Sequence, residues 1–377
     1  MANNNDNKVL NVPHLRFPEF SGEWKMCTIG ELTTKVGSGV TPRGGEAVYK
    51  TEGHPFVRSQ NVGLGNLLLD DIAFIDEETH LRQKSTELQF NDVLLNITGA
   101  SIGRSALVDK QIVGGNVNQH VCIIRTKENL VPSFICSFLL SNYGQRQIDS
   151  FQAGGNRQGL NFEQIKSIKI TIPSKDEQIK IAKLLRAIDE RIATQNKIID
   201  KLQSLIKGIA QNVARNNKPN IRLSECLECS SSTLQESDVC KNGTYPVYGA
   251  NGIVGYLDNY NTEKEAVYII KDGSGVGTVS YVTGKCSATG TLNTLQAKEG
   301  YSLQYLYYML KVFNFEPYKT GMAIPHIYFK DYGKAKVFCP SHSEQFKYTK
   351  LLSTIDSKLL AEQNALVNYN LQKQYLL

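Results

Sequence analysis

Two stretches of the chain carry apolar residues at steps of three and four. In the first, apolar side chains recur at positions 181, 184, 185, 188, 192, 198, 199, 202, 205, 206 and 209. This spacing puts them on one face of a helix over 174–212, about 58 Å long at 1.5 Å per residue. The second stretch, 341–377, predicts a helix of about 55 Å. A helix of this length needs a partner for its apolar stripe.

The two predicted helices share an internal repeat. Residues 173–189 (PSKDEQIKIAKLLRAID) and 340–356 (PSHSEQFKYTKLLSTID) are identical at 10 of 17 positions without a gap. Each copy starts with a serine and has a glutamate three residues later, which predicts a capping box for Ser174 with Glu177 and for Ser341 with Glu344. We therefore expect an antiparallel coiled coil that acts as a rigid spacer. Its predicted packing residues are Leu184, Leu185, Ile188, Ile192, Ile199, Leu202, Leu351, Leu352, Ile355 and Leu359.

The regions before each helix correspond more loosely. GASIGRSALV (99–108) is similar to GSGVGTVSYV (273–282), and 131–140 and 301–310 both predict short apolar helices. Short β-rich segments and Gly/Asn turns fill the intervals. The predicted fold class is α+β with a pseudo-twofold internal duplication. Its predicted parts are a globular domain 1–173, a long helix with linker 174–218, a second globular domain 219–340 and a second long helix 341–377.

The alternative interpretation of the periodic stretches is two unrelated amphipathic helices, each packed on its own domain. We favour the spacer because a globular domain of this size rarely needs such a helix.

Charge and composition change this picture little. The 377 residues predict two or three domains at roughly 150 residues each. The net charge of +6 sits mostly in 174–218, which carries 10 basic and 5 acidic side chains, so net charge alone does not argue for nucleic acid. No run of 18 apolar residues predicts a membrane span, and the start MANNNDNKVL lacks signal-peptide features. We expect a cytoplasmic protein with reduced cysteines.

Several segments together resemble one protein family. VPHLRFPEFSGEWKMCTIGEL (12–32) is similar to the start of DNA-specificity subunits of type I restriction–modification enzymes. IKITIPSKDEQIKIAKLLRAID (168–189), AKVFCPSHSEQFKYTKLLSTID (335–356) and YPVYGANGIVGYLD (245–258) also resemble segments of that family. The resemblance covers almost the whole chain in the family's order. Its one departure is the polar Asn368, Asn370, Gln372 and Gln374 in the second helix, which leave the length of the distal pairing open.

The resemblance implies a non-catalytic subunit. Each globular domain would be a target recognition domain that reads one half of a split double-stranded DNA sequence. The helix pair would set the spacing and dock two methyltransferase subunits, which restriction subunits then join. S-adenosylmethionine, ATP and magnesium would bind those partners, and no cofactor would bind this chain. A near alternative is the specificity subunit of a simpler methylation-and-cleavage system that lacks the motor.

Catalytic motifs are missing from the sequence, as a specificity subunit requires. There is no GxxxxGK[ST], no Asn-Pro-Pro-aromatic tetrad and no HExxH. Two alternatives of other classes stay open: a self-contained enzyme with an unfamiliar site, and a coiled-coil adaptor with no DNA role. Cys226 and Cys229 form a CxxC, with Cys240 and Cys286 downstream, but a zinc site usually needs a second close pair. We therefore expect no metal.

Candidate DNA contacts lie in Gly-rich and polar loops of both domains. Arginine, asparagine and glutamine match base edges, whereas hydroxyls, lysines and loop amides match phosphates. The alternative for each residue is a solvated side chain that bonds its own turn. The predicted DNA-binding residues are Arg43, Arg58, Ser59, Gln60, Asn61, Ser101, Arg104, Asn116, Asn118, Gln119, Arg157, Gln158, Tyr245, Tyr248, Asn251, Lys271, Ser274, Thr291, Asn293 and His326.

Overall fold

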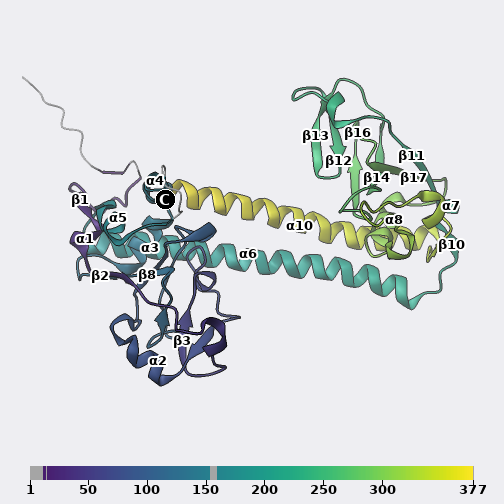
Figure 1. Cartoon of the computed structure of the whole chain (residues 1–377). Helices are drawn as coiled ribbons and strands as arrows, with labels where there is room; N and C mark the ends of the chain where they lie inside the picture. The colour runs from purple at the N-terminus through teal and green to yellow at the C-terminus, as the bar shows by residue number, and fades with distance from the viewer. Residues whose placement is uncertain (1–11, 14, 153–158, 377) are drawn as a thin grey trace, which may run out of the picture. The chain divides into compact units, whose positions relative to one another are not determined.

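The computed structural model describes residues 12–13, 15–152 and 159–376 and divides into two compact units (Figure 1). Unit 1 is Met1–Thr194 with Val367–Leu377, and unit 2 is Gln195–Leu366. Each unit contains part of both long helices, α6 (Lys175–Asn216) and α10 (His342–Leu376). Both helices begin one residue after their predicted starts.

Unit 1 contains two sheets and a separate strand pair. The four-stranded antiparallel sheet has the order β2 (Thr33–Ser38), β8 (Val121–Thr126), β5 (Val93–Asn96), β6 (Ser105–Leu107). The three-stranded sheet has the order β4 (Ala73–Ile75), β3 (His54–Val57), β7 (Asn116–Val117), with β3 and β7 parallel. Strand β1 (Lys25–Thr28) pairs with β9 (Lys169–Ile172).

The helices of unit 1 lie at its two ends. Figure 1 places α1 (Ile29–Leu32), α3 (Pro132–Leu140), α4 (Asn142–Ser150) and α5 (Phe162–Ser167) toward the start of α6. Helix α2 (Glu77–Arg82) lies with β3 at the other end. Short 3₁₀ turns occupy Gly45–Val48, Ser59–Asn61, Lys84–Thr86 and Gly99–Ser101.

Unit 2 repeats this architecture. Its four-stranded sheet has the order β11 (Leu227–Ser231), β17 (Leu292–Ala297), β14 (Glu265–Ile270), β15 (Val279–Thr283). Its three-stranded sheet has the order β13 (Gly252–Leu257), β12 (Tyr245–Gly249), β16 (Ser287–Ala288), with β12 and β16 parallel. Strand β10 (Ile221–Arg222) pairs with β18 (Lys336–Val337). The helices are α7 (Leu223–Cys226), α8 (Leu303–Lys311) and α9 (Phe329–Tyr332), with 3₁₀ turns at Glu236–Asp238 and Glu316–Tyr318.

The strand orders establish the internal duplication. Each strand of one unit has a counterpart at the same place in the other, so β5 corresponds to β14 and β8 to β17. Both central strands are buried almost throughout, because each sheet is covered on both faces, and their sequences VLLN and EAVYII are accordingly apolar. The predicted α+β fold with a pseudo-twofold repeat is confirmed.

The long helices run antiparallel within each unit. In unit 1, Lys373 pairs with Asp189, and the Arg191 guanidinium donates to the Tyr369 hydroxyl at 3.1 Å. In unit 2, the Gln195 amide donates to the carbonyl of Glu362 at 3.0 Å. Rising numbers on α6 therefore meet falling numbers on α10, as the spacer hypothesis requires.

The predicted packing residues divide by exposure. Buried are Leu185, Ile199, Leu352 and Leu359, and half-buried are Ile188, Ile192, Leu202 and Ile355. Leu184 and Leu351 differ, because their side chains are 38% and 49% exposed. These two leucines occupy the same position of the repeat, so the helices turn the same face outward in both copies.

The predicted capping boxes form only in part. The Glu177 amide donates to Ser174 Oγ at 3.4 Å, but the Glu177 carboxylate is bound by Arg16 through two hydrogen bonds of 2.8 and 2.7 Å. In the second copy, Ser341 Oγ donates to the Glu344 carboxylate at 2.9 Å instead of accepting from the amide. In the first copy, a distant arginine from the N-terminal segment takes the carboxylate that the local pattern assigned to the cap.

Candidate nucleic-acid interface

In unit 2, backbone hydrogen bonds hold three loops together at the end of β14. The Lys271 amide donates to the carbonyl of Thr291 at 3.0 Å, and the Lys271 carbonyl accepts from the Ile327 amide at 2.9 Å. The Gly273 amide donates to the carbonyl of Pro325 at 3.0 Å. We call the joined loops 271–278, 289–292 and 320–327 the unit 2 loop cluster.

This cluster gathers four predicted DNA contacts from separate parts of the sequence. They are Lys271, Ser274, Thr291 and His326. The Asp272 carboxylate holds the His326 side chain, because His326 Nδ1 lies 2.6 Å from Asp272 Oδ1. Asp272 was not predicted, although its place in the KDGSG turn next to Lys271 was a signal for it.

Unit 1 has the same arrangement at the end of β5. The Ile97 amide donates to the carbonyl of His120 at 3.0 Å, and the Ile97 carbonyl accepts from the Leu160 amide at 2.9 Å. Thr98 Oγ1 lies 2.5 Å from His120 Nδ1. We call the joined loops 58–61, 97–104 and 118–120 the unit 1 loop cluster.

Asn96 is the polar centre of the unit 1 loop cluster. It is fully buried, and its Nδ2 donates to the carbonyl of Ser59 at 2.8 Å and to Ser101 Oγ at 3.1 Å. Two predicted DNA contacts, Ser59 and Ser101, are thereby brought together. In the third loop, the Gln119 side-chain oxygen accepts from the Thr41 amide at 3.0 Å. The sequence signal for Asn96 was a polar residue that closes the apolar strand VLL.

The two clusters share a backbone and differ in side chains. The bonds that Ile97 makes in unit 1 are those that Lys271 makes in unit 2, so these residues are equivalent. By the same criterion His120 corresponds to Thr291. The bridges Thr98↔Gly159 and Asp272↔His326 also coincide, which puts a glycine where unit 2 has a histidine. One scaffold therefore presents different chemistry in each unit.

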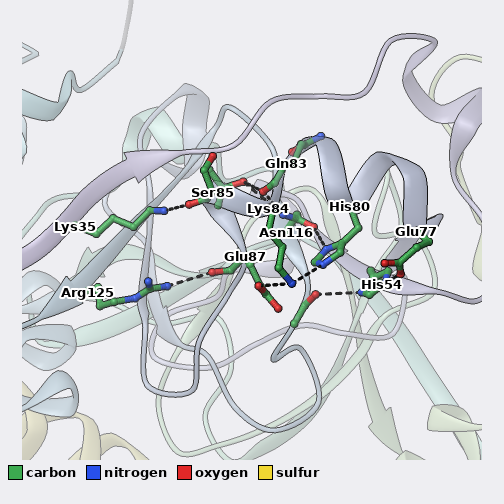
Figure 2. Close-up of polar contacts among 12 residues, drawn as sticks. Lys35, His54, Glu77, His80, Gln83, Lys84, Ser85, Glu87, Asn116 and Arg125 are labelled. Atoms are coloured by element: carbon green, nitrogen blue, oxygen red, sulfur yellow. Dashed lines mark hydrogen bonds and ion pairs between the residues drawn. The ribbon is translucent and has the colours of Figure 1, made fainter.

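Four predicted asparagines are buried and occupied inside the protein. Asn116 lies 2.8 Å from His80 Nδ1 through its Oδ1, and its Nδ2 donates to the carbonyl of Gln83 at 2.9 Å (Figure 2). Asn293 Nδ2 donates to the Tyr332 hydroxyl at 3.1 Å, Asn61 Nδ2 to the carbonyl of Leu68 at 2.9 Å, and Asn118 Oδ1 accepts from the His120 amide at 3.0 Å. Their side chains support loops from within.

Other predicted contacts of unit 1 are exposed or paired. Arg43, Arg104 and Gln119 are exposed. The Arg58 guanidinium donates to the Asp71 carbonyl at 2.7 Å, and the exposed Gln60 side chain also bonds the Asp71 carboxylate. Arg157 and Gln158 lie outside the described residues.

The β12–β13 hairpin of unit 2 carries the remaining candidates. Tyr248 is half-buried against Tyr268, with ring centroids 5.7 Å apart. Tyr245 lies edge-on to Tyr260 at 5.1 Å, and Lys285 Nζ sits 4.7 Å from the Tyr260 centroid. Asn251 is exposed at the turn. The hairpin is joined to the unit 2 loop cluster, because the Tyr248 carbonyl accepts from the Thr289 amide at 2.9 Å.

A repeated glutamine ties the globular part of each unit to its long helix. Gln178 Oε1 accepts from the amide of Val131, the residue that caps α3, at 2.9 Å, and Nε2 donates to the Pro173 carbonyl at 3.0 Å. Gln345 is equivalent. Its Oε1 accepts from the amide of Ser302, the cap of α8, at 2.9 Å, and Nε2 donates to the Pro340 carbonyl at 2.9 Å. Both glutamines are buried.

The family profile described as "Type I restriction modification DNA specificity domain" matches the chain twice, over residues 21–204 and 219–369. The chain belongs to this family. The two matches coincide with the two copies of the duplicated architecture, each with its recognition region and most of its long helix.

Individual relatives of the specificity family agree with this assignment. A candidate type I restriction enzyme specificity subunit, MjaX, of Methanocaldococcus jannaschii is 21% identical over 210 residues, covering 55% of this chain and 49% of the relative. The type I restriction enzyme EcoKI specificity subunit of Escherichia coli is 23% identical over 202 residues, covering 50% and 41%. The chain thus spans about half the length of the curated relatives that it matches.

Solved structures of specificity subunits share the fold. The crystal structure of a type I restriction–modification S subunit from Mycoplasma genitalium superposes with a TM-score of 0.64 at 18% identity, covering 94% of this chain and 95% of that one. A chain from a study of complex assembly and conformational transition of the type I system gives 0.57 at 16% identity, covering 97% and 98%.

The cysteines of this specificity-family chain are mostly core residues. Burial raises the pKa of Cys226 to about 12 and that of Cys229 to about 11. Cys240 is exposed and Cys286 buried. Over residues 15–152 and 159–376, no group of three or more His, Cys, Asp or Glu side chains is placed to hold a metal ion. Nor does the described part contain a helix long and apolar enough to cross a bilayer.

Proposed function

We propose that this chain is the DNA-specificity subunit of a type I restriction–modification complex. The observation that carries the proposal is the pair of loop clusters, which stand on equivalent backbone positions of the two units. Each recognition domain reads one half of a bipartite double-stranded DNA target. The helices α6 and α10 set the spacing between the halves.

The two half-sites differ in sequence. A shared backbone presents Thr98 and His120 in unit 1, where the neighbouring Ile97 is buried in the core. It presents Lys271, Asp272 and Thr291 at the same places in unit 2. Donor and acceptor patterns on base edges are distinguished by the side chains that face them, so different side chains select different bases.

The predicted DNA-binding residues divide into contacts and supports. We retain the exposed or half-exposed residues as contacts, and we keep Arg157 and Gln158, which lie outside the described residues, as contacts on their sequence alone. Asn61, Asn116, Asn118 and Asn293 act as supports, because their amides are already bonded inside the protein. Arg58 holds Asp71 and orients the loop that carries Gln60.

Two copies of one methyltransferase subunit dock on the repeated helix surface. Lys183 with Leu184 and Lys350 with Leu351 are identical pairs in the repeat, and all four side chains are exposed. Buried identities such as Leu185 and Leu352 are explained by packing, but exposed identities are not. Equivalent surfaces suit two equivalent partners.

The reaction chemistry belongs to the partner subunits. The methyltransferases bind S-adenosylmethionine, and the restriction subunits that join them bind ATP and magnesium. This chain contributes recognition and assembly and catalyses no step. The complex acts on DNA in the cytoplasm.

Mapping of methylated adenines tests the proposal. DNA is sequenced from cells that carry this chain with its methyltransferase and from cells in which the chain is deleted. We expect a split motif that disappears on deletion. A coiled-coil adaptor without a DNA role predicts no lost motif and no salt-dependent DNA binding by the purified complex, and that pair of results would overturn the proposal.

A matched pair of helix variants tests the docking surface. We expect Leu184→Asp and Leu351→Asp each to remove one methyltransferase copy, counted by native mass spectrometry. Leu205→Asp is the control, because Leu205 is also exposed on α6 but corresponds to Gln372 in the repeat. Retention of two copies by both variants would contradict this docking site. Cleavage without ATP would instead favour the motor-less system.

A further inference from the structure

The unit 2 loop cluster carries a short finger with an apolar tip. The finger spans 320–326, and its base is closed by two hydrogen bonds, from the Thr320 amide to the His326 carbonyl at 2.9 Å and from the His326 amide back at 2.7 Å. At the tip, Met322 is fully exposed and Ile324 is 59% exposed. Among the large apolar side chains of the described residues, that of Met322 is the most exposed.

The finger is held in a fixed conformation. Gly321 has φ +89°, and a Cβ at this position would lie 2.3 Å from the Ile324 carbonyl oxygen, so only glycine fits the turn. The Gly273–Pro325 hydrogen bond and the Asp272–His326 contact attach the base to the neighbouring loop. The tip is therefore presented in a set direction, and little ordering remains to be done on binding.

The surroundings of the tip favour nucleic acid as the partner. Lys271 and Ser274 lie in the loop to which the finger is bonded, and both suit phosphate contacts. Stacked bases offer an apolar surface against which the tip can pack. Methionine and isoleucine are among the side chains that enter base steps. The equivalent sequence of the first copy reads Asn156, Arg157, Gln158 instead of Met322, Ala323, Ile324, so the apolar pair belongs to the second copy alone.

We propose that Met322 and Ile324 form a wedge that enters a base step of the half-site read by the second recognition domain. This inference rests on the proposed function. The wedge unstacks one step, and sequences whose step unstacks at low cost are favoured there. The finger thus selects sequence through DNA deformability as well as through direct contact.

Fluorescence of 2-aminopurine tests the wedge. The complex of the full chain with its methyltransferase is added to duplexes that carry the probe at successive positions of the mapped half-site. With the unmodified chain we expect 2-aminopurine fluorescence to rise several-fold at one base step. With the double variant Met322→Ser, Ile324→Ser we expect no rise in fluorescence at that step. Affinity should fall on the order of tenfold, the scale of losing one stacking contact.

Two controls keep the outcomes separate. Leu81→Ser removes an exposed leucine from α2 of unit 1 and should leave both readouts unchanged. The target base that a methyltransferase turns out of the helix gives a second signal, which the finger variant should retain at saturating protein. If the motif is absent altogether, the proposed function fails. If the motif is present and the step signal is the same in the finger variant, the wedge alone is wrong.

Discussion

At the scale of single residues, buried polar groups fix each recognition region. Gln178 and Gln345 stand at identical places in the repeat and make equivalent bonds, each to a helix-capping amide and to a proline carbonyl. A buried group that loses its partner costs more than the bond itself contributed. These glutamines thus connect each recognition region firmly to its own long helix.

Replacing Gln178 with leucine should destabilise unit 1. The Val131 amide and the Pro173 carbonyl would lose their partner in a buried place, for a cost of about 1–3 kcal/mol. Trp24 is the one tryptophan of the chain and lies in unit 1, so its fluorescence in a urea titration reports this unit. Gln89→Leu, at an exposed position of unit 1, should leave the midpoint unchanged. Equal midpoints for both variants would contradict this role of Gln178.

The ion pair of Arg125 with Asp92 is a second test at this scale. Arg125 donates twice to the Asp92 carboxylate, at 2.7 Å each, and Asp92 is buried. The carboxylate raises the pKa of Arg125, chiefly through these hydrogen bonds. Arg125→Met would strand a buried charge and should cost about 3 kcal/mol in the same titration. Arg82→Met breaks an exposed pair with Glu78 and should cost less than about 1 kcal/mol.

At the scale of elements, the proposed function assigns the spacing between half-sites to the long helices. Each helix belongs partly to unit 1 and partly to unit 2. The boundary between the units falls between Thr194 and Gln195 on α6 and between Leu366 and Val367 on α10. Pairing is antiparallel within each unit. The same number of residues added to both helices at these places therefore preserves every contact inside a unit.

Insertion of one heptad into each long helix at the unit boundary should lengthen the gap between half-sites. Seven residues add about 10 Å, or roughly three base pairs. The half-sites themselves should not change, and methylation mapping measures both. Insertion of a heptad into α6 alone is the matched control. It shifts the register of α6 against α10 and should abolish DNA recognition instead. An unchanged gap with the double insertion would mean that the helices are not the spacer.

At the scale of the whole molecule, the two parts of the duplication differ in how far their copies have diverged. The helix repeat is identical at 10 of 17 positions, whereas the loop clusters share their backbone and little of their side-chain chemistry. On the proposed function, one copy can thus change its target while the other copy and the docking surface stay as they are.

Exchange of residues 1–173 for the recognition domain of another family member should change one half-site only. The loop cluster in that segment makes its bonds within unit 1, so the second half-site and its finger are untouched. Methylation mapping again gives the result, with the unexchanged chain in the same host as control. A change in both half-sites would show that the domains are not independent readers.

The sequence by itself determined the repeat, the two long helices, the α+β class and the family. These features are written in local patterns, because helical periodicity and repeated motifs need no knowledge of which distant residues meet. The sequence did not predict that Leu184 and Leu351 are exposed, because both fit the apolar periodicity. Only the packing shows which positions of an apolar stripe are buried.

Only the tertiary structure decided which polar loop residues are available. Asn116 and Arg104 looked alike in the sequence, as polar side chains near glycines, yet Asn116 is bonded to His80 inside unit 1 and Arg104 is exposed. The Arg16 guanidinium binds the Glu177 carboxylate, which the sequence pattern assigned to the helix cap, although the two residues are 161 positions apart. Such partners are chosen by the fold, because a buried polar group bonds whichever group the chain brings within reach.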